Sequence, residues 1–410
     1  MKILLLGYGK EGQAIEKYFR NHEKDAEFTI WQDFDASTLK QRDYSSFDYI
    51  FRSPSVPPLH HKNETSVTRY FFDHCPCPII GVTATKGKGT TCSFIKSLLD
   101  AEGEDAHLVG NIGEPAINAL DQLTESSVVV YELSSFQLWD LTKSPHISVI
   151  GQLEPDHLNV HRDYDDYLNA KQNITRYQTA SDYCIYYQDN PDSVRLATES
   201  PKPHKVPYPF DLPEPVKAAI TLPGIHNQNN ATAALAAVAS YYNLSPDAYL
   251  QQSEATIIQG LQSFRGLPHR LEFVREINGI KFYDDNFSTN PSSTRVAIQA
   301  FPDSDVTLII GGRDKTNNED LPEIYRTISA PNVRHVVLIG ESGHALAQKY
   351  PDDTRFKLAE SLPEAITIAT TLAQTDPHPI VLMSPAAASF DMFNNVYDRG
   401  ERYQKIIQSL

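Results

Sequence analysis

The sequence predicts an α/β protein with mainly parallel sheets, folded as three domains. Apolar runs of strand length alternate with amphipathic stretches of helix length along the 410 residues, and this alternation is typical of α/β units. At about 100 to 200 residues per domain, a chain of this length holds two to four domains. Stretches rich in proline or glycine near residues 77 and 266 divide it into predicted domains at 1–77, 78–266 and 267–410.

Each predicted domain has its own apolar strands. In the first they are KILLL (2–6), FTIW (28–31) and DYIF (48–51), with a helix through Tyr18 and Phe19 after the first strand. In the second they are PIIGVT (78–83), SVVVYEL (127–133) and ISVIGQL (147–153), with helices from about Thr90 and after Gly224. In the third, VTLIIGG (306–312), VRHVVLIG (333–340) and PIVLMS (379–384) follow a hairpin, which alternating runs around Asn278-Gly279 predict.

A glycine-rich turn follows the first strand and opens the first helix. It consists of Gly7, Tyr8, Gly9, Lys10, Glu11 and Gly12, and Asp33 stands at the end of the next strand. Glycines let the backbone approach a diphosphate, the helix N-terminus attracts its charge, and the acid can bind a ribose hydroxyl. The block is only one half of a dinucleotide-binding unit, so we expect a Rossmann-like domain that binds one nucleotide diphosphate. A tight turn without a ligand is the alternative.

A second glycine-rich loop, between Gly81 and Thr91, joins another strand to a helix. It departs twice from the strict phosphate-loop pattern, because its first glycine is one residue too early and Gly89 stands where Ser or Thr usually follows the lysine. Its chemistry is still suited to phosphate, since backbone N–H groups can surround the anion and Lys88 can bridge two phosphates. The hydroxyl of Thr90 can bind Mg²⁺. We therefore expect a central domain like the P-loop ATPases.

Composition excludes several classes of protein. Lys and Arg total 36 against 52 Asp and Glu, a net charge of −16, which argues against a protein that coats nucleic acid. Four cysteines are too few to staple the chain and fit a reducing compartment. The apolar run at residues 3–6 is too short for a signal segment or a membrane span. We expect a cytoplasmic protein that binds neither nucleic acid nor membrane.

Several short motifs occur in the order typical of one ligase family. They are TKGKGTT (85–91), GNIG (110–113), ELSSFQL (132–138), Asp156-His157, Lys171, GIHNQNN (224–230) and GLPHR (266–270). With them the chain resembles the Mur ligase family over essentially its whole length. ELSSFQL, GLPHR, the late SPAAAS (384–389) and Arg399-Gly400 are typical of the member that adds D-glutamate.

The resemblance implies an ATP-dependent amide ligase of peptidoglycan precursor synthesis. ATP would phosphorylate the carboxylate of UDP-N-acetylmuramoyl-L-alanine, and the amine of D-glutamate would then displace phosphate from the acyl phosphate. Two Mg²⁺ ions are implied, one held by Thr90 and Glu132 and the other by His157 and a carbamylated Lys171. From the residues alone, His157 is one of a structural His–Asp pair and Lys171 is a solvated helix residue.

The resemblance also implies which residues bind each substrate. For ATP they are Thr85, Lys86, Gly87, Lys88, Gly89, Thr90, Thr91, Asn230, Arg270 and Asp285. For the UDP substrate they are Gly7, Tyr8, Gly9, Lys10, Glu11, Gly12, Asp33 and Asn111. For the amino acid they are Thr289, Lys315, Ser389 and Phe390, and the implied catalytic residues are Lys88, His157 and Lys171.

The sequence departs from the family pattern at two positions. Phe287 stands where a lysine is typical, and Val396 stands where an aromatic residue is typical. One cationic contact to the incoming amino acid is therefore missing, although Arg313 or Ser288 could replace it. This departure bears on which amino acid is used.

Three other functions remain as alternatives. The first is another ligase of the same superfamily with a different amino acid or acceptor. The second is a nicotinamide-dependent oxidoreductase that uses the turn at residues 7–12. The third is a nucleotide-binding switch without catalysis. For the ligase we expect a monomer whose partners are its small-molecule substrates.

Overall fold

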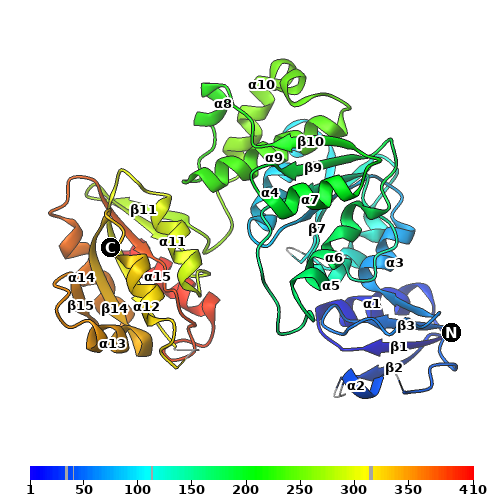
Figure 1. The fold of residues 1–410 in the computed structure, drawn as a ribbon, viewed down its shortest axis with the longest axis horizontal. Coiled ribbons are helices and arrows are strands. Elements are labelled where there is room, and N and C mark those ends of the chain that lie inside the picture. Colours follow the sequence, from blue (N-terminus) through cyan, green and yellow to red (C-terminus); the bar gives the residue numbers. More distant parts are fainter. Residues whose placement is uncertain (33–35, 40, 112–113, 314–316) are drawn as a thin grey trace. The chain divides into compact units, whose positions relative to one another are not determined.

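The computed structural model describes residues 1–32, 36–39, 41–111, 114–313 and 317–410 (Figure 1). Two predicted site residues, Asp33 and Lys315, lie outside the described residues. The chain divides into two compact units. The first comprises Met1–Ile220 and Gln228–Phe264, and the second comprises Thr221–Asn227 and Arg265–Leu410.

The first sheet has the order β2-β1-β3-β4, and its strands are parallel. The strands are β1 (Lys2–Leu6), β2 (Glu27–Trp31), β3 (Tyr49–Arg52) and β4 (Glu64–Ser66), and the helices are α1 (Lys10–His22), α2 (Ala36–Leu39) and α3 (Val67–His74). Alternate residues of β1 face opposite sides: Ile3 and Leu5 belong to the core that includes Phe19, whereas Leu4 packs in a second cluster with Leu39. This alternation is what a two-sided parallel sheet requires.

The second sheet is also parallel, with the order β10-β9-β8-β5-β7-β6. The strands are β5 (Ile79–Thr83), β6 (Asp105–Gly110), β7 (Ser127–Glu132), β8 (Ile147–Ile150), β9 (Tyr183–Tyr187) and β10 (His204–Tyr208). The helices are α4 (Lys88–Ala101), η1 (Ala116–Asn118), η2 (Leu120–Gln122), α5 (Ser135–Leu138), α6 (Tyr164–Arg176), α7 (Pro191–Glu199), α8 (Glu214–Ala218), α9 (Ile225–Tyr241) and α10 (Pro246–Ser263). The central strand β5 leads into α4, so the second glycine-rich loop lies at the carboxyl edge of the sheet, where α/β proteins bind ligands.

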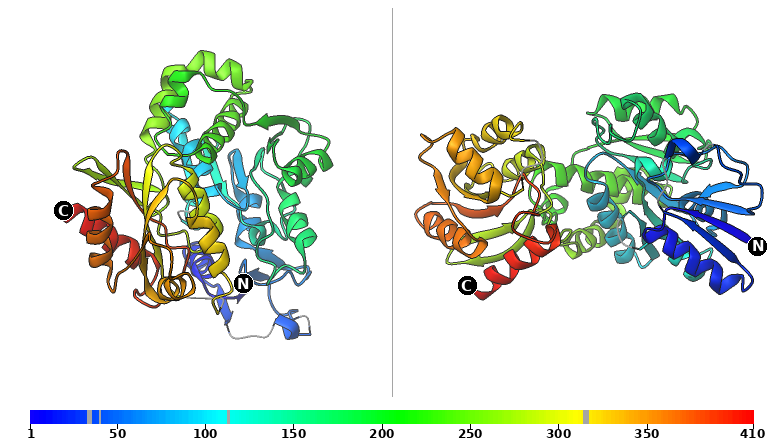
Figure 2. Two further views of the ribbon diagram at one scale, coloured as in Figure 1. Left: turned by 60° about the vertical axis from the view of Figure 1, so that its left-hand side comes forward. Right: turned by 90° about the horizontal axis from the view of Figure 1, so that it is seen from below.

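The third sheet has the order β11-β12-β16-β13-β14-β15, with only β11 antiparallel. Its strands are β11 (Glu272–Ile277), β12 (Ile280–Asp284), β13 (Asp305–Gly311), β14 (Val333–Ile339), β15 (Phe356–Leu358) and β16 (Pro379–Met383). The helices are α11 (Pro291–Gln299), α12 (Leu321–Ile328), α13 (Gly340–Lys349), α14 (Leu362–Ala373) and α15 (Val396–Ser409). Leu308 packs with α11–α13 and Ile309 packs with α14 and α15, so helices cover both faces, as Figure 2 shows in yellow to red.

The predicted fold class is confirmed, and so are the predicted apolar strands and the hairpin. Asn278 and Gly279 both have positive φ, 51° and 83°, as a type I′ turn requires. The first two sheets share one core, in which the rings of Phe71 and Tyr131 lie 5.6 Å apart. The domain boundaries near residues 77 and 266 stay predictions. Within the described part of the chain, none of the helices combines the length and the apolar character needed to cross a membrane.

Candidate active site

The loop between β5 and α4 leaves the first turn of α4 without a side-chain cap. Its N-cap residue, Gly87, has φ +84° and no capping side chain, whereas the N-terminus of α6 is capped by Asp163. The N–H groups of the first turn of a helix need acceptors. The start of α4 is therefore suited to a phosphate group, and Thr90 lies half-buried within this turn.

Asn230 of α9 lies directly against this loop. Its Oδ1 accepts a hydrogen bond from the Thr91 hydroxyl at 3.3 Å. A Cβ atom added to Gly87 would lie 2.7 Å from the same oxygen, so Gly87 is needed both for its positive φ and for space. The structure thus brings Asn230 together with two other predicted ATP-binding residues, Gly87 and Thr91.

Lys88 and Lys171 converge on the loop from opposite sides. Lys88 Nζ donates to the carbonyl oxygens of Ala84, at 2.9 Å, and Thr85, at 3.1 Å. Lys171 Nζ donates to the same Ala84 oxygen at 3.0 Å and to the Thr83 hydroxyl at 2.9 Å. The two amines therefore share one acceptor, although they come from different helices.

Lys171 is not the solvated helix residue that its type suggests. It is 1% exposed, and its Nζ lies 4.8 Å from the ring centre of Tyr167. Burial, with the nearby charge of Lys88, holds the pKa of Lys171 well below its usual value. This shift favours the neutral amine, which is the nucleophilic form of lysine.

Glu132, at the end of β7, brings a carboxylate into the same region. It is 5% exposed, and its Oε1 accepts a hydrogen bond from Asn111 Nδ2 at 3.0 Å. Its charge acts on Lys171 and favours the protonated form, against the larger effect of burial. A buried carboxylate with a second oxygen to share suits a hard cation such as Mg²⁺.

His157 is exposed and its backbone has a φ of 55°. Its ring lies 5.0 Å from that of Phe136, and its Nε2 is 3.6 Å from a carboxylate oxygen of Asp156. The neighbouring His161 is buried instead and its Nε2 lies 2.9 Å from the Ser135 hydroxyl. Burial lowers the pKa of His161, with the charges of His157 and Lys171 adding to the effect. His157 thus has a half-exposed ring beside Phe136 and Asp156.

Sequence reasoning missed Tyr167 and Thr83 at this site, and it named Thr85 only as a residue that binds ATP. The Thr85 hydroxyl is 2.8 Å from the Tyr167 hydroxyl and accepts from the backbone N–H of Glu154 at 3.0 Å. The Thr83 hydroxyl donates to the carbonyl of Leu133 at 2.9 Å. These bonds join the loop to the segments that follow β7 and β8. Only the helical spacing of Tyr167 and Lys171, one turn apart on α6, could have indicated part of this arrangement.

The first glycine-rich turn is tightly built. Gly7 has φ +85°, and a Cβ added to Gly12 would lie 2.8 Å from the Gly7 carbonyl oxygen. Glu11 points to the second sheet, where its Oε1 accepts from Gln137 Nε2 at 2.9 Å. Burial raises the pKa of Glu11. The Tyr8 hydroxyl donates to Glu16. Neither the alternative of an empty turn nor binding of the UDP substrate is tested by these contacts.

The predicted site residues of the second unit lie near the hairpin and the end of β16. Asp285 is buried, and its carboxylate accepts from the backbone N–H of Leu271 at 3.1 Å and the Ser384 hydroxyl at 2.7 Å. Burial raises the pKa of Asp285 to about 7. Arg270 is exposed, with its guanidinium carbon 4.8 Å from the ring centre of Phe287. Both are predicted to bind ATP, and those roles stay predictions.

The predicted amino-acid site shows a mixed picture. Ser389 is 2% exposed and Phe390 is 69% exposed, while Thr289 lies half-buried just before α11. Arg313, which could replace the missing lysine, pairs with Glu341 at 2.6 Å. Ser288 is buried and hydrogen-bonds to Asp285.

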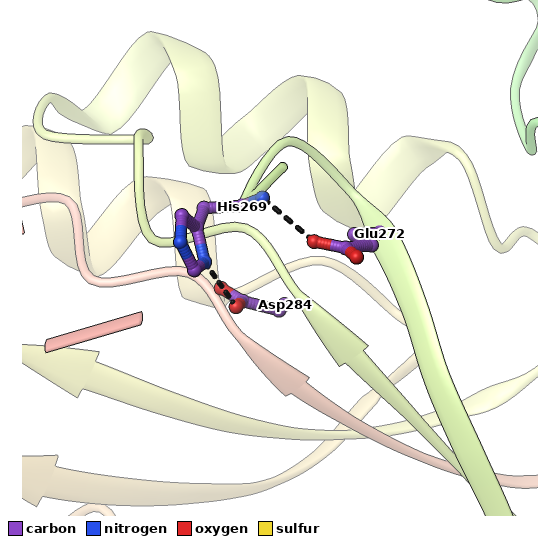
Figure 3. A group of neighbouring side chains, drawn as sticks. All are labelled: His269, Glu272 and Asp284. Carbon is purple, nitrogen blue, oxygen red and sulfur yellow. Dashed lines mark hydrogen bonds and ion pairs between the residues drawn. The ribbon is translucent and has the colours of Figure 1, made fainter. Parts of the chain in front are cut away.

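A buried polar cluster lies behind Phe287. Figure 3 shows its three members His269, Glu272 and Asp284, whose ligand-type atoms all lie within 4.8 Å of one another. His269 Nδ1 is 2.7 Å from Asp284 Oδ2, and this contact raises the pKa of His269. Gln404 Nε2 donates to both carboxylates, at 2.7 and 2.9 Å. Since each member already has a hydrogen-bond partner, the cluster is built as a structural support.

Arg399 extends this support from α15. Its guanidinium is fully buried and donates to Asn286 Oδ1 at 2.8 Å and to the carbonyls of Asn286, Ala387 and Ala388 at 3.1 to 3.3 Å. Burial lowers the pKa of Arg399 to about 10. The arginine therefore ties the segment after β12 to the segment after β16, which carries the predicted amino-acid residues.

The chain is similar to known ligases in sequence. Two family models match the chain: the Mur ligase middle domain over residues 82–214, and the Mur ligase, glutamate ligase domain over residues 269–387. The UDP-N-acetylmuramoylalanine--D-glutamate ligase of Acetivibrio thermocellus is 34% identical over 403 residues, which cover 89% of this chain and 83% of the relative. The ligase of the same name from Clostridium tetani is 30% identical over 399 residues, with 89% and 84% covered.

Solved structures show the same fold at low identity. MurF from Acinetobacter baumannii has a TM-score of 0.62 at 17% identity and covers 92% of this chain and 89% of its own. MurC from Thermotoga maritima has a TM-score of 0.60 at 16% identity and covers 100% and 99%. The three-sheet arrangement is therefore shared with these proteins.

Proposed function

The chain belongs to the Mur ligase family, and from that premise we infer that it joins D-glutamate to UDP-N-acetylmuramoyl-L-alanine with ATP, in the synthesis of peptidoglycan precursors. Relatives named for this reaction match most of the chain. The observation that carries the chemistry is the convergence of Lys88 and Lys171 on the Ala84 carbonyl, beside the uncapped start of α4. The alternative of a nicotinamide-dependent oxidoreductase has no support among these relatives.

We assign the phosphate-binding role to the start of α4. The backbone N–H groups after Gly87 and the amine of Lys88 offer donors around one concave loop. In the free enzyme, Lys88 donates to loop carbonyls. Because these are neutral acceptors, a phosphate oxygen can take its hydrogen bonds at a gain. Thr91 and Asn230 fix the loop from the side of α9.

The donor set fits magnesium. Glu132 supplies a buried carboxylate and Thr90 a hydroxyl at the first site, and His157 and Lys171 would hold the second ion. Bound Mg²⁺ would neutralise phosphate charge during transfer and stabilise the oxygen atoms of the acyl phosphate. The residues of the chain bind and orient the ions and substrates.

We propose that Lys171 is carbamylated in the active enzyme. Its amine is buried, which favours the neutral form, so its nitrogen can attack the carbon of CO₂. The N–C bond forms, one C–O π bond of CO₂ opens to place the negative charge on oxygen, and the proton of the nitrogen passes to water. The product is an anionic oxygen ligand where a cation would repel Mg²⁺. Bicarbonate labelled with ¹³C should give a carbamate NMR signal that Lys171→Ala abolishes. Loss of that signal while full activity remains would remove the carbamate from the mechanism.

One experiment tests the reaction itself. An amino-acid panel with UDP-N-acetylmuramoyl-L-alanine and ATP should give ADP with D-glutamate and little with other amino acids. ADP formation without an acceptor would indicate a nucleotide-binding switch, and preference for an uncharged amino acid would indicate another member of the superfamily.

We also propose that the enzyme is a cytoplasmic monomer. Its ATP and UDP-linked substrates are cytoplasmic metabolites, and its four cysteines are free. Light scattering coupled to gel filtration tests the monomer, which a mass of twice 46.0 kDa would contradict.

A further inference from the structure

Phe287 forms an aromatic platform with Tyr397 beneath Arg270. The rings of Phe287 and Tyr397 meet edge to face, with centres 5.1 Å apart and planes at 81°. The guanidinium carbon of Arg270 lies 4.8 Å from the Phe287 ring centre. The aromatic residue that is typical at position 396 is thus present one residue later, and it contacts the phenylalanine that replaces the typical lysine.

The backbone fixes Arg270 and Phe287 to each other. Arg270 stands between two residues with left-handed backbone, His269 with φ 59° and Leu271 with φ 50°. The N–H of Phe287 donates to the His269 carbonyl at 3.2 Å. Two non-glycine residues in this conformation are strained and persist only where their surroundings hold them. The arginine therefore leaves the backbone in one defined direction, over the ring.

The support behind the ring is rigid. The His269 ring lies nearly parallel to that of Phe287, with centres 6.3 Å apart, and it is held by Asp284. On its other side, a Cβ added to Gly400 would lie 2.3 Å from His269 Nδ1. The imidazole is thus confined between α15 and Phe287, so the platform cannot yield easily.

Arg270 contacts the face of the Phe287 ring through its guanidinium carbon. Contact with a ring face uses the plane of a guanidinium, while its N–H groups lie at the edge of that plane. Among the described residues, no carboxylate lies within ion-pair distance of Arg270. A lysine at position 287 would repel Arg270, whereas phenylalanine attracts and orients it.

We propose that Phe287 is a positioning residue that orients the Arg270 guanidinium to receive a phosphate group of ATP. This proposal rests on the proposed function, because ATP binding by Arg270 is part of it. At the position where a lysine is typical of the family, this chain then has a phenylalanine that holds a neighbouring cation in place.

The test first compares the kinetic constants of three single variants. Phe287→Leu keeps an apolar side chain but removes the ring, and it should raise the KM for ATP about threefold, as expected for a lost cation–π contact at an exposed site. The KM for D-glutamate should stay unchanged. Phe287→Trp keeps an aromatic ring, so its KM for ATP should stay near that of the wild type. Phe273→Leu, at an exposed phenylalanine on β11, is the matched control.

A double variant tests whether Phe287 acts on ATP binding through Arg270. In an Arg270→Ala background, Phe287→Leu should add nothing to the loss of ATP affinity. A KM change for D-glutamate alone, or an additive effect in the double variant, would overturn the proposal. If Arg270→Ala itself leaves the KM for ATP unchanged, the ATP role of Arg270 fails instead. Should Phe287→Leu lower the melting temperature by more than a few degrees, Phe287→Met replaces it with closer volume.

Discussion

Lys88 and Lys171 donate hydrogen bonds to one oxygen, the carbonyl of Ala84, at 2.9 and 3.0 Å. Two protonated amines beside a single neutral acceptor would repel each other, and the repulsion is stronger where water is excluded. Lys171 is the more deeply buried of the two, and this burial lowers its pKa and favours its neutral form. The charge of Lys88 at this loop therefore also favours the neutral form of Lys171.

We expect Lys88→Ala to lower both turnover and carbamylation. Turnover should fall by several orders of magnitude, because positioned charge supplies most of the catalysis of phosphoryl transfer. Carbamate occupancy at limiting bicarbonate should also fall, since the charge of Lys88 favours the neutral amine of Lys171 and attracts the carbamate anion. Carbon-13 NMR and single-turnover ADP formation measure the two effects.

The control for this variant is Lys96→Ala, on the same helix. Lys96 pairs with Asp100 on the exposed face of α4, and its removal should leave both readouts unchanged. Full carbamate occupancy in Lys88→Ala would show that Lys88 does not act on Lys171.

Gly87→Ala should cost more stability than Gly103→Ala. The two glycines have nearly the same backbone, with φ +84° and +85°. A Cβ added at Gly87 would lie 2.7 Å from Asn230 Oδ1, whereas a Cβ added at Gly103 would have no atom within 4 Å. Backbone strain of about 1 to 2 kcal/mol applies to both. The excess loss in Gly87→Ala isolates the contact with Asn230, and urea unfolding measures it. Equal losses would mean that Asn230 moves aside freely.

The fold was predictable where strands are apolar and buried. β1, β5, β13 and β16 are continuous apolar runs, as strands covered on both faces must be. The shorter or more polar strands were not predicted: they are β4, β6, β9, β10 and β15. Four of these, β4, β6, β10 and β15, lie at sheet edges, where one side of the strand has no partner.

The glycine-rich loops of the site could be predicted from the sequence, but the buried contacts of its side chains could not. Sequence placed Lys88 and Thr90 at the start of a helix, because a strand, a glycine-rich turn and an amphipathic run follow one another. It could not show that Lys171 is buried against Thr83, or that Arg270 stacks on Phe287, because these contacts join segments far apart in the chain. The spacing of Tyr167, Lys171 and Ile174 on the buried face of α6 was a usable signal.

The four cysteines should react with alkylating agents in a fixed order. Cys75 Sγ lies 3.6 Å from Cys77 Sγ, and the hydrogen bond from Cys77 lowers the pKa of Cys75 and raises that of Cys77. Burial raises the pKa of Cys92, and that of Cys184 to about 11. Iodoacetamide should therefore label half-buried Cys75 first, since the thiolate is the nucleophile.

Peptide mass spectrometry over time gives the order. Cys75→Ser should abolish the fast phase and leave Cys92 and Cys184 protected until the protein unfolds. Equal rates at Cys75 and Cys92 in the native protein would contradict the prediction.

Asp285 should make the second unit less stable as pH rises. Burial raises its pKa to about 7, against the opposing hydrogen bonds of Ser288, Ser384 and the Leu271 backbone. The folded state thus binds the proton more tightly than the unfolded state, whose aspartate has a pKa of about 4. The contribution to stability is full below pH 4 and is lost as pH rises through about 7, an effect of at most about 4 kcal/mol.

Asp285→Asn removes this titration. Raising the pH from 4 to 8 should therefore destabilise the wild type relative to the variant. Hydrogen exchange of the β16 amides, compared between the two proteins at each pH, reports on the second unit and cancels the intrinsic pH effect. Asp303→Asn, at an exposed aspartate of the same unit, is the control and should show no such shift. A difference that stays constant across this range would mean that the hydrogen bonds outweigh burial, and that Asp285 remains ionised in the folded protein.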